Sequence, residues 1–151
     1  MKTITSVVLL GLVAGCAQTR NYEVRLRNAS GEPITYGLVK QGEPFDRKWE
    51  SPEQAAIRGD KPPADMWGTL APGRMADPSA KGKFRSGAVA VLRVYQGSLD
   101  LPEILATSEG QPNRLDIPLH PGVNRLVVTD VDGDFAANRD EPEPKSPVQR
   151  Q

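Results

Sequence analysis

The sequence has very few of the side chains that most often carry enzymatic chemistry. Its 151 residues include one cysteine, Cys16, and one histidine, His120. A single cysteine excludes a disulfide within the chain. A Ser-His-Asp triad could use only His120, which precedes a Pro-Gly turn where we expect it to be exposed, and no serine lies in a nucleophile-elbow pattern. The sequence also lacks a phosphate-binding glycine loop and a paired-cysteine metal motif.

Net charge and long apolar runs are also missing. The 19 basic side chains are balanced by 19 acidic ones, so no overall positive field favours nucleic acid as a partner. The longest apolar run, residues 4–13, has about ten residues, whereas a membrane-spanning helix needs roughly 20. We therefore expect neither nucleic-acid binding nor a permanent transmembrane helix.

The N-terminal residues do have the pattern of a targeting signal. A basic residue, Lys2, precedes the apolar run, and the small residues Ala14 and Gly15 precede Cys16. This order is typical of a secretory signal. The four residues Val13, Ala14, Gly15 and Cys16 form a lipobox, so the segment closely resembles bacterial lipoprotein signals.

The lipoprotein resemblance carries specific expectations for the mature chain. It implies cleavage before Cys16, a diacylglycerol thioether on the Cys16 sulfur, and acylation of the new amino terminus. Two or three acyl chains hold a protein on a membrane permanently. Ala17, rather than aspartate, follows the cysteine, which by the same resemblance implies an outer-membrane anchor facing the periplasm.

The remaining sequence is divided into a tether, one domain and a tail. Residues 1–15 are the predicted signal peptide and residues 16–21 a short tether, which reaches roughly 17 Å when extended. Residues 22–137 form the predicted domain. Residues 138–151 hold three prolines among charges and one aliphatic side chain, so we predict a disordered tail.

Short alternating apolar segments separated by turns predict strands in this domain. Residues 22–26 and 34–38 are expected to form a hairpin. Residues 115–119 contain Pro118, which indicates an edge strand or a bulge. Residues 75–83 are expected to be a polar loop. The remaining predicted strands span residues 66–70, 88–95 (the central one), 104–106 and 123–128 (the return strand).

One short helix is predicted among these strands. Ser51 can cap it, Pro52 suits its first position, and Gln54 completes a capping box. Gly59 is a plausible end, and Trp49 could provide packing. The predicted fold class is therefore all-β: an antiparallel two-layer β-sandwich, immunoglobulin-like or transthyretin-like, with one short helix. A barrel is the alternative.

Five oxygen-bearing residues near the C-terminus have the spacing of a calcium loop. Counted from Asp130, the side chains at positions 1, 3, 5, 9 and 12 are Asp130, Asp132, Asp134, Asn138 and Glu141. This spacing resembles the EF-hand loop, in which such side chains bind Ca²⁺. These five residues are therefore a candidate calcium site.

The calcium loop has a simpler competing interpretation. Its sixth position is Phe135, where the EF-hand turn requires glycine, and neither flank has a helical pattern. The sequence Asp132-Gly133 can instead form a turn that closes the last strand.

Two further groups of side chains could recognise a ligand. Arg93 interrupts the apolar central strand, and we expect it to pair with a carboxylate such as Glu23 or to reach the rim. The aromatic residues could form a platform for a sugar or a peptide, although we expect most of them in the core. Trp49 and Phe45 are the pair predicted to be exposed.

These observations favour a function without catalysis. We predict a membrane-anchored cell-envelope lipoprotein that acts as an interaction or assembly module, with an envelope protein or a glycan as partner. Its first candidate surfaces are the sandwich edges and the loop of residues 40–50. A calcium- or carbohydrate-binding module is the alternative. A hydrolase using Glu53 or Asp65 has the least support, because carboxylates without geometry are uninformative.

Overall fold

The computed structural model describes residues 16–107 and 113–140, which form two packed β-sheets and short helices. Sheet A has the strand order β4-β1-β8-β9, and β5 also pairs with β1. Sheet B has the order β3-β2-β6-β7. Sheet A consists of β1 (Gln18–Asn28), β4 (Met75–Ala76), β5 (Ser79–Phe84), β8 (Gly122–Val131) and β9 (Asp134–Arg139). Sheet B consists of β2 (Ile34–Gln41), β3 (Trp67–Leu70), β6 (Val89–Gln96) and β7 (Arg114–Pro118).

Two open sheets exclude the barrel and confirm a two-layer β protein. The predicted central strand is β6, which lies between β2 and β7, and β7 with Pro118 is an edge strand as expected. The strands extend from Gln18 to Arg139, beyond both predicted ends of the domain. Residues 138 and 139 therefore belong to β9, not to the predicted tail; residues 141–151 lie outside the described part.

The pairing of the first strands differs from the prediction. β1 and β2 lie in opposite sheets, so they form no hairpin, and β7 and β8 are likewise in different sheets. The turn after β1 is held by buried Asn28, whose amide donates to the carbonyl oxygens of Leu70 (3.0 Å) and Glu32 (2.8 Å). Alternation shows which side of a strand is buried but not which sheet the strand joins.

The sandwich is not antiparallel throughout. β1 and β8 run parallel, from the pair Tyr22 and Gly122 to the pair Asn28 and Val128. β8 thus lies beside the first strand of the chain, and the predicted return strand at residues 123–128 pairs with no part of β7. Parallel neighbours need a long connection, and here it contains all four strands of sheet B together with β4 and β5 of sheet A.

The core lies between the two sheets, where alternate side chains of each strand meet. Tyr22, Val24 and Leu26 point inward from β1, and Leu92 and Val94 point inward from β6. Each of these five side chains is at most 1% exposed. The predicted alternation is confirmed here.

The segment predicted as a polar loop, residues 75–83, forms β4 and β5 instead. In β5, Ala80, Gly82 and Phe84 face the core and alternate with exposed neighbours. Because two of these inward residues are small, the segment has little apolar signal in the sequence.

Trp49 explains why β5 has small inward residues. It ends the short 3-10 helix η1 (Arg47–Trp49) and is only 1% exposed, so its predicted exposure is wrong. Its indole packs edge-on against Tyr22 and Phe84, with ring centroids 5.7 Å and 5.3 Å away. A Cβ on Gly82 would lie 2.5 Å from the Trp49 Nε1 atom. Gly82 therefore provides the space that the indole fills.

The two α-helices have the same kind of N-terminus. α1 (Pro52–Arg58) has the predicted capping box of Ser51 and Gln54, and it ends at Gly59 in the left-handed conformation. α2 (Leu101–Thr107) replaces the strand predicted at residues 104–106. Asp100 and Glu103 each accept a hydrogen bond from the other's backbone N–H group, at 2.9 and 2.7 Å, which is also a capping box.

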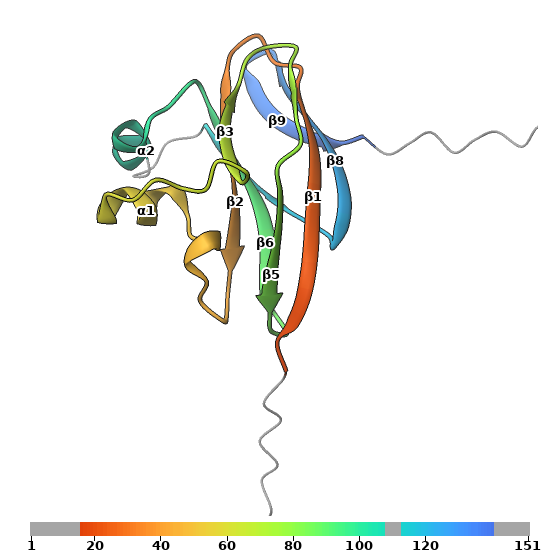
Figure 1. Ribbon diagram of the computed structural model, residues 1–151. Coiled ribbons are helices and arrows are strands. Elements are labelled where there is room, and N and C mark those ends of the chain that lie inside the picture. The colour runs from red at the N-terminus through yellow and green to blue at the C-terminus, as the bar shows by residue number, and fades with distance from the viewer. Residues whose placement is uncertain (1–15, 108–112, 141–151) are drawn as a thin grey trace, which may run out of the picture.

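Both helices lie on the outward side of sheet B, away from sheet A (Figure 1). Beneath them is a second apolar layer in which Val91 and Tyr95 of β6 are buried. Ala55 of α1 and Ile104 of α2 are also buried. Strand β6 is thus covered on both faces, which explains its continuous apolar sequence.

Candidate functional site

Cys16 lies directly at the start of the folded body. It is exposed, and β1 begins two residues later at Gln18. The predicted tether of residues 16–21 is therefore mostly part of β1. Residues 1–15, the predicted signal, lie outside the described residues. A lipid on Cys16 would hold the sandwich almost in contact with the membrane.

The first three predicted calcium ligands lie in the β8–β9 hairpin. Its turn consists of Asp132 and Gly133, both with positive φ, as expected for an Asp-Gly hairpin turn. Asp130 pairs with Phe135, which packs on the core, whereas Asp134 pairs with Val131. Because neighbouring residues of a strand point to opposite faces, the Asp130 and Asp134 side chains leave the hairpin on different sides.

The other two predicted ligands do not complete a site in the described chain. Asn138 lies in β9 opposite Val127, and Glu141 lies outside the described residues. Residues 16–107 and 113–140 contain no group of three or more His, Cys, Asp or Glu side chains that could hold a metal ion. Calcium binding stays a prediction, which a melting experiment with millimolar Ca²⁺ on the wild type and Asp132→Ala would test.

Asp130 belongs to a small polar group at the edge of the core. The Gln96 amide donates to Asp130 Oδ2 at 3.5 Å and to Glu32 Oε2 at 3.1 Å. Asp130 Oδ1 is buried without a hydrogen-bond partner among the described residues. Gln96 therefore joins the end of β6 to the turn after β1 and to β8.

A largely buried charged group lies under helix α1. Arg93, on the outward face of β6, donates from Nε and Nη2 to the two carboxylate oxygens of Asp116, at 2.7 and 2.9 Å. Its Nη1 donates to Glu53 Oε2 of α1 at 2.9 Å. Glu53 Oε1 accepts a hydrogen bond from the Tyr95 hydroxyl group, and Arg114 lies 3.6 Å from both carboxylates. We call these five residues the Arg93 cluster.

The sequence predicted that Arg93 would pair with a carboxylate, and this is confirmed, but Glu23 is not the partner. Glu23 points outward from sheet A and accepts a hydrogen bond from Asn21. The actual partners are 40 and 23 residues from Arg93 in the chain. The polar position of Asp116 within an alternating strand was the one signal that could have indicated it.

The surroundings of the cluster shift the pKa values of its members. Burial alone would raise the pKa of Glu53, but the hydrogen bond from Tyr95 and the charge of Arg93 hold that pKa below its usual value. Burial and the hydrogen bond to Glu53 raise the pKa of Tyr95. Burial would lower the pKa of Arg93, yet the bond to Asp116 and the charge of Glu53 raise it. Glu53 thus stays ionised and Tyr95 stays neutral at neutral pH.

This arrangement holds helix α1 on sheet B. Each carboxylate oxygen of Glu53 faces a donor, and the two Asp116 oxygens are held by one guanidinium group. Glu53 therefore pins α1 to β6 and β7. The other carboxylate considered for hydrolysis, Asp65, is far more exposed and pairs with Lys48 at 3.3 Å.

The loop of residues 40–50 is held in place and presents one aromatic ring. Phe45 is 65% exposed, as predicted. The buried Trp49 anchors the end of the loop, and Arg47 Nη2 lies 2.5 Å from Asp60 Oδ2. An exposed phenyl group on a fixed loop is a feature of contact surfaces.

His120 is exposed, as predicted, and lies at the turn before β8. Its backbone N–H donates to Asn124 Oδ1 at 3.0 Å, and its carbonyl oxygen accepts from the Asn124 amide at 2.8 Å. The residue thus takes part in turn formation through its backbone.

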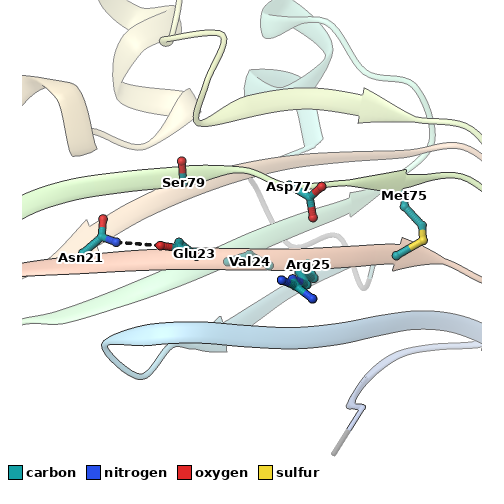
Figure 2. Close-up of a pocket in the computed structure, with 7 residues that line it drawn as sticks. All are labelled: Asn21, Glu23, Val24, Arg25, Met75, Asp77 and Ser79. Atoms are coloured by element: carbon teal, nitrogen blue, oxygen red, sulfur yellow. Dashed lines mark hydrogen bonds between the residues drawn. The ribbon is translucent and has the colours of Figure 1, made fainter. Parts of the chain in front are cut away.

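Among the described residues, no helix covers the outward face of sheet A, and two arginines there form no ion pair. Arg25 and Arg125 are register partners, and neither forms an ion pair within the described residues. Glu23 and Arg25 of β1 line a hollow of about 570 Å³. Figure 2 shows them with Asp77 on the neighbouring segment. This open hollow has charges of both signs.

Comparison with protein families and with curated proteins provides no basis for assigning a function. No protein-family model and no curated protein matches the sequence. Within the described residues, no helix is long and apolar enough to cross a membrane.

Proposed function

We propose that this chain is a lipid-anchored cell-envelope protein whose β-sandwich acts as a non-catalytic interaction or assembly module. Its anchor is Cys16, in the outer membrane and facing the periplasm. The proposal follows from the lipoprotein-like signal of residues 1–16 combined with the position of Cys16.

The position of Cys16 is the observation that carries the proposal. The residue is exposed, and only Ala17 separates it from β1. An acyl chain attached there would meet no part of the core, since the buried side chains of β1 begin at Tyr22. The anchor and the fold are therefore compatible, and the domain would sit within about 10 Å of the bilayer surface.

We further propose that the sandwich is transthyretin-like rather than immunoglobulin-like. In immunoglobulin domains the first two strands lie in the same sheet, which has the order ABED. Here β1 and β2 lie in opposite sheets. Of the two arrangements expected from the sequence, this pairing favours the transthyretin-like one.

The absence of catalysis is part of the proposal, and the state of Glu53 supports it. A general acid or base needs a proton position that is open to a substrate and a pKa near the working pH. The pKa of Glu53 is shifted downward, away from neutrality, and its oxygens are already paired.

We propose the loop of residues 40–50 as the first contact surface for an envelope protein, with Phe45 at its centre. Exposed aromatic side chains on ordered loops supply contact area at a small entropy cost. The edge strands β7 and β9 are the second surface, since each exposes unpaired backbone groups.

The test is photo-crosslinking in living cells. A photoreactive residue placed at Phe45 should capture one discrete envelope protein. The matched controls are Ile57 and Met75, which are 74% and 63% exposed on other parts of the surface. Equal capture from all three positions, or none from Phe45, would contradict this surface. Replacing Cys16 with Ala should abolish membrane association and the crosslink together.

A further inference from the structure

The end of the sandwich that carries Cys16 is strongly basic. The strand ends and turns that meet there are residues 16–21, 40–43 and 81–88. They contain five cations and one acidic side chain, Glu43. The cations are Arg20, Lys40, Lys81, Lys83 and Arg85, and we call this end the anchor pole.

Contacts between three segments bring these cations together. Thr19 and Lys83 are register partners, and Lys40 Nζ donates to the Lys83 carbonyl oxygen at 3.1 Å. The Arg85 N–H donates to the Glu43 carbonyl oxygen at 3.1 Å. Figure 1 shows the start of β1 beside the end of β5 at the lower end of the molecule.

Two of the cations come from opposite sheets and close the end of the core. Arg20 Cζ lies 6.0 Å from the centre of the Phe84 ring, and Lys40 Nζ lies 5.3 Å from it. These cation–π contacts hold both stems against the core while the charges reach the end of the sandwich.

None of the five cations forms an ion pair within residues 16–107 and 113–140. Lys81, Lys83 and Arg85 are exposed. The chain as a whole has no net charge, so this concentration of positive charge is local. The acidic side chains near them in the described chain, Glu43 and, in the hollow beside Lys40, Asp46 and Glu50, form no ion pair with them, so the five cations repel one another unless an anionic surface lies next to them.

We propose that the anchor pole binds the anionic phospholipid headgroups of the membrane that holds Cys16. This inference deepens the proposed function and rests on its membrane anchor. Lys83 pairs with a residue three positions from Cys16, a distance of roughly 10 Å along the chain. That distance is similar to the Debye length of about 8 Å at physiological ionic strength, so the charges would act on the headgroups.

The opposite end of the sandwich provides an internal control. β1 has eleven residues, so its C-terminal end lies roughly 35 Å from its start. Arg27 and Arg74 are exposed at that far end. They carry the same charge as the lysines of β5 but would lie several Debye lengths from the bilayer.

The test is vesicle binding by the chain that cleavage would leave, starting at residue 16 and carrying Cys16→Ser. The vesicles contain phosphatidylcholine alone or with one third phosphatidylglycerol. We expect binding only to the anionic vesicles, with loss of binding at 1 M salt. Each cation near such a surface contributes about a factor of five. Lys81→Glu with Lys83→Glu should therefore weaken binding about 25-fold or more, whereas Arg27→Glu with Arg74→Glu should change it less than about twofold.

Equal weakening by the two pairs would overturn the proposal, because the attraction would then follow total charge. Equal binding to the two kinds of vesicle would overturn it as well. The Cys16→Ser protein carries no lipid. Its failure to bind anionic vesicles would therefore contradict the role of the anchor pole but not the lipid anchor at Cys16. The anchor itself is decided separately, by the mass of the protein from its own membrane.

Discussion

The outward faces of the two sheets use their charges differently. On sheet B, helices α1 and α2 cover the strands, and Arg93 is buried with two carboxylates around it. On sheet A no helix covers the strands, and Arg25 and Arg125 stand side by side without a carboxylate partner in the described chain. On the covered outward face of sheet B, the buried arginine is neutralised by carboxylates of the chain. On the outward face of sheet A, which we call the bare face, the two arginines remain exposed to solvent.

This difference separates the structural charges from those that are free to meet a partner. A buried cation without its carboxylates costs several kcal/mol, whereas exposed charges contribute little to stability. The charges that matter for folding should therefore lie on sheet B, and those that matter for interactions on sheet A and at the anchor pole. The following substitutions test this division, from the largest expected effect to the smallest.

Arg93→Met should destabilise the fold most. It removes the ion-pair partner of Glu53, whose side chain is only 13% exposed, and of the more exposed Asp116, and breaking such a largely buried pair costs about 3–5 kcal/mol. Urea unfolding gives this free energy directly. The matched control is Arg27→Met on the bare face, which should change the free energy of unfolding by less than about 0.5 kcal/mol. Equal effects of the two substitutions would mean that the faces do not differ.

Ile104→Ala tests whether the cover over sheet B is part of the core. Ile104 is fully buried in α2, and its truncation should cost about 2–5 kcal/mol. Val123, on the bare face, is 53% exposed, and Val123→Ala should have a much smaller effect. If the stability of Ile104→Ala matched that of the wild type, α2 would be a detachable element.

Tyr95→Phe tests the hydrogen bond within the Arg93 cluster. The hydroxyl donates to a carboxylate, so its removal should cost about 1.5–3 kcal/mol at neutral pH. The effect should also depend on pH. Because the folded pKa of Glu53 is lowered, its stabilising contribution is complete above its ordinary pKa of 4.5 and is lost as the pH falls below it.

Without the Tyr95 hydroxyl, the pKa of Glu53 moves back towards its ordinary value. The acid loss of stability should therefore be smaller in Tyr95→Phe than in the wild type. Urea midpoints measured from pH 7 to pH 3 would show the difference. Parallel curves for the two proteins would contradict the assigned role of this hydrogen bond.

Arg125→Glu should have the smallest effect, and it should be stabilising. Arg125 is the register partner of Arg25, so the substitution replaces a like-charge pair with an exposed ion pair. Exposed pairs contribute about 0–1 kcal/mol, and the gain should disappear at 1 M salt. A loss of stability would show that Arg125 has a structural role that the bare face does not reveal.

Sequence reasoning succeeded where the signal was local. Ser51, Gln54 and Gly59 determine α1 through contacts within the same turn, and the structure has each of them as predicted. Asp100 and Glu103 form an equally local signal for α2, but the apolar residues after them were interpreted as a strand. The local pattern therefore also indicated helix α2, although the prediction did not use it.

The rest depended on contacts between distant segments. Alternation in β1 and β2 gave no information about which sheet each joins, and the inward Gly82 makes sense only with Trp49 packed against it. The Arg93 cluster joins three elements, so neither its membership nor the burial of Glu53 could be deduced from spacing. Cys16 is the opposite case, since its interpretation rests on a signal within 16 residues.

The most direct test of the account is the intact mass of the protein purified from the membrane of its own host. We expect the mass of the chain from Cys16 onward plus a diacylglyceryl group and an amide-linked acyl chain. A free thiol at Cys16, or a protein that retains residues 1–15, would contradict the membrane anchor and the function proposed from it.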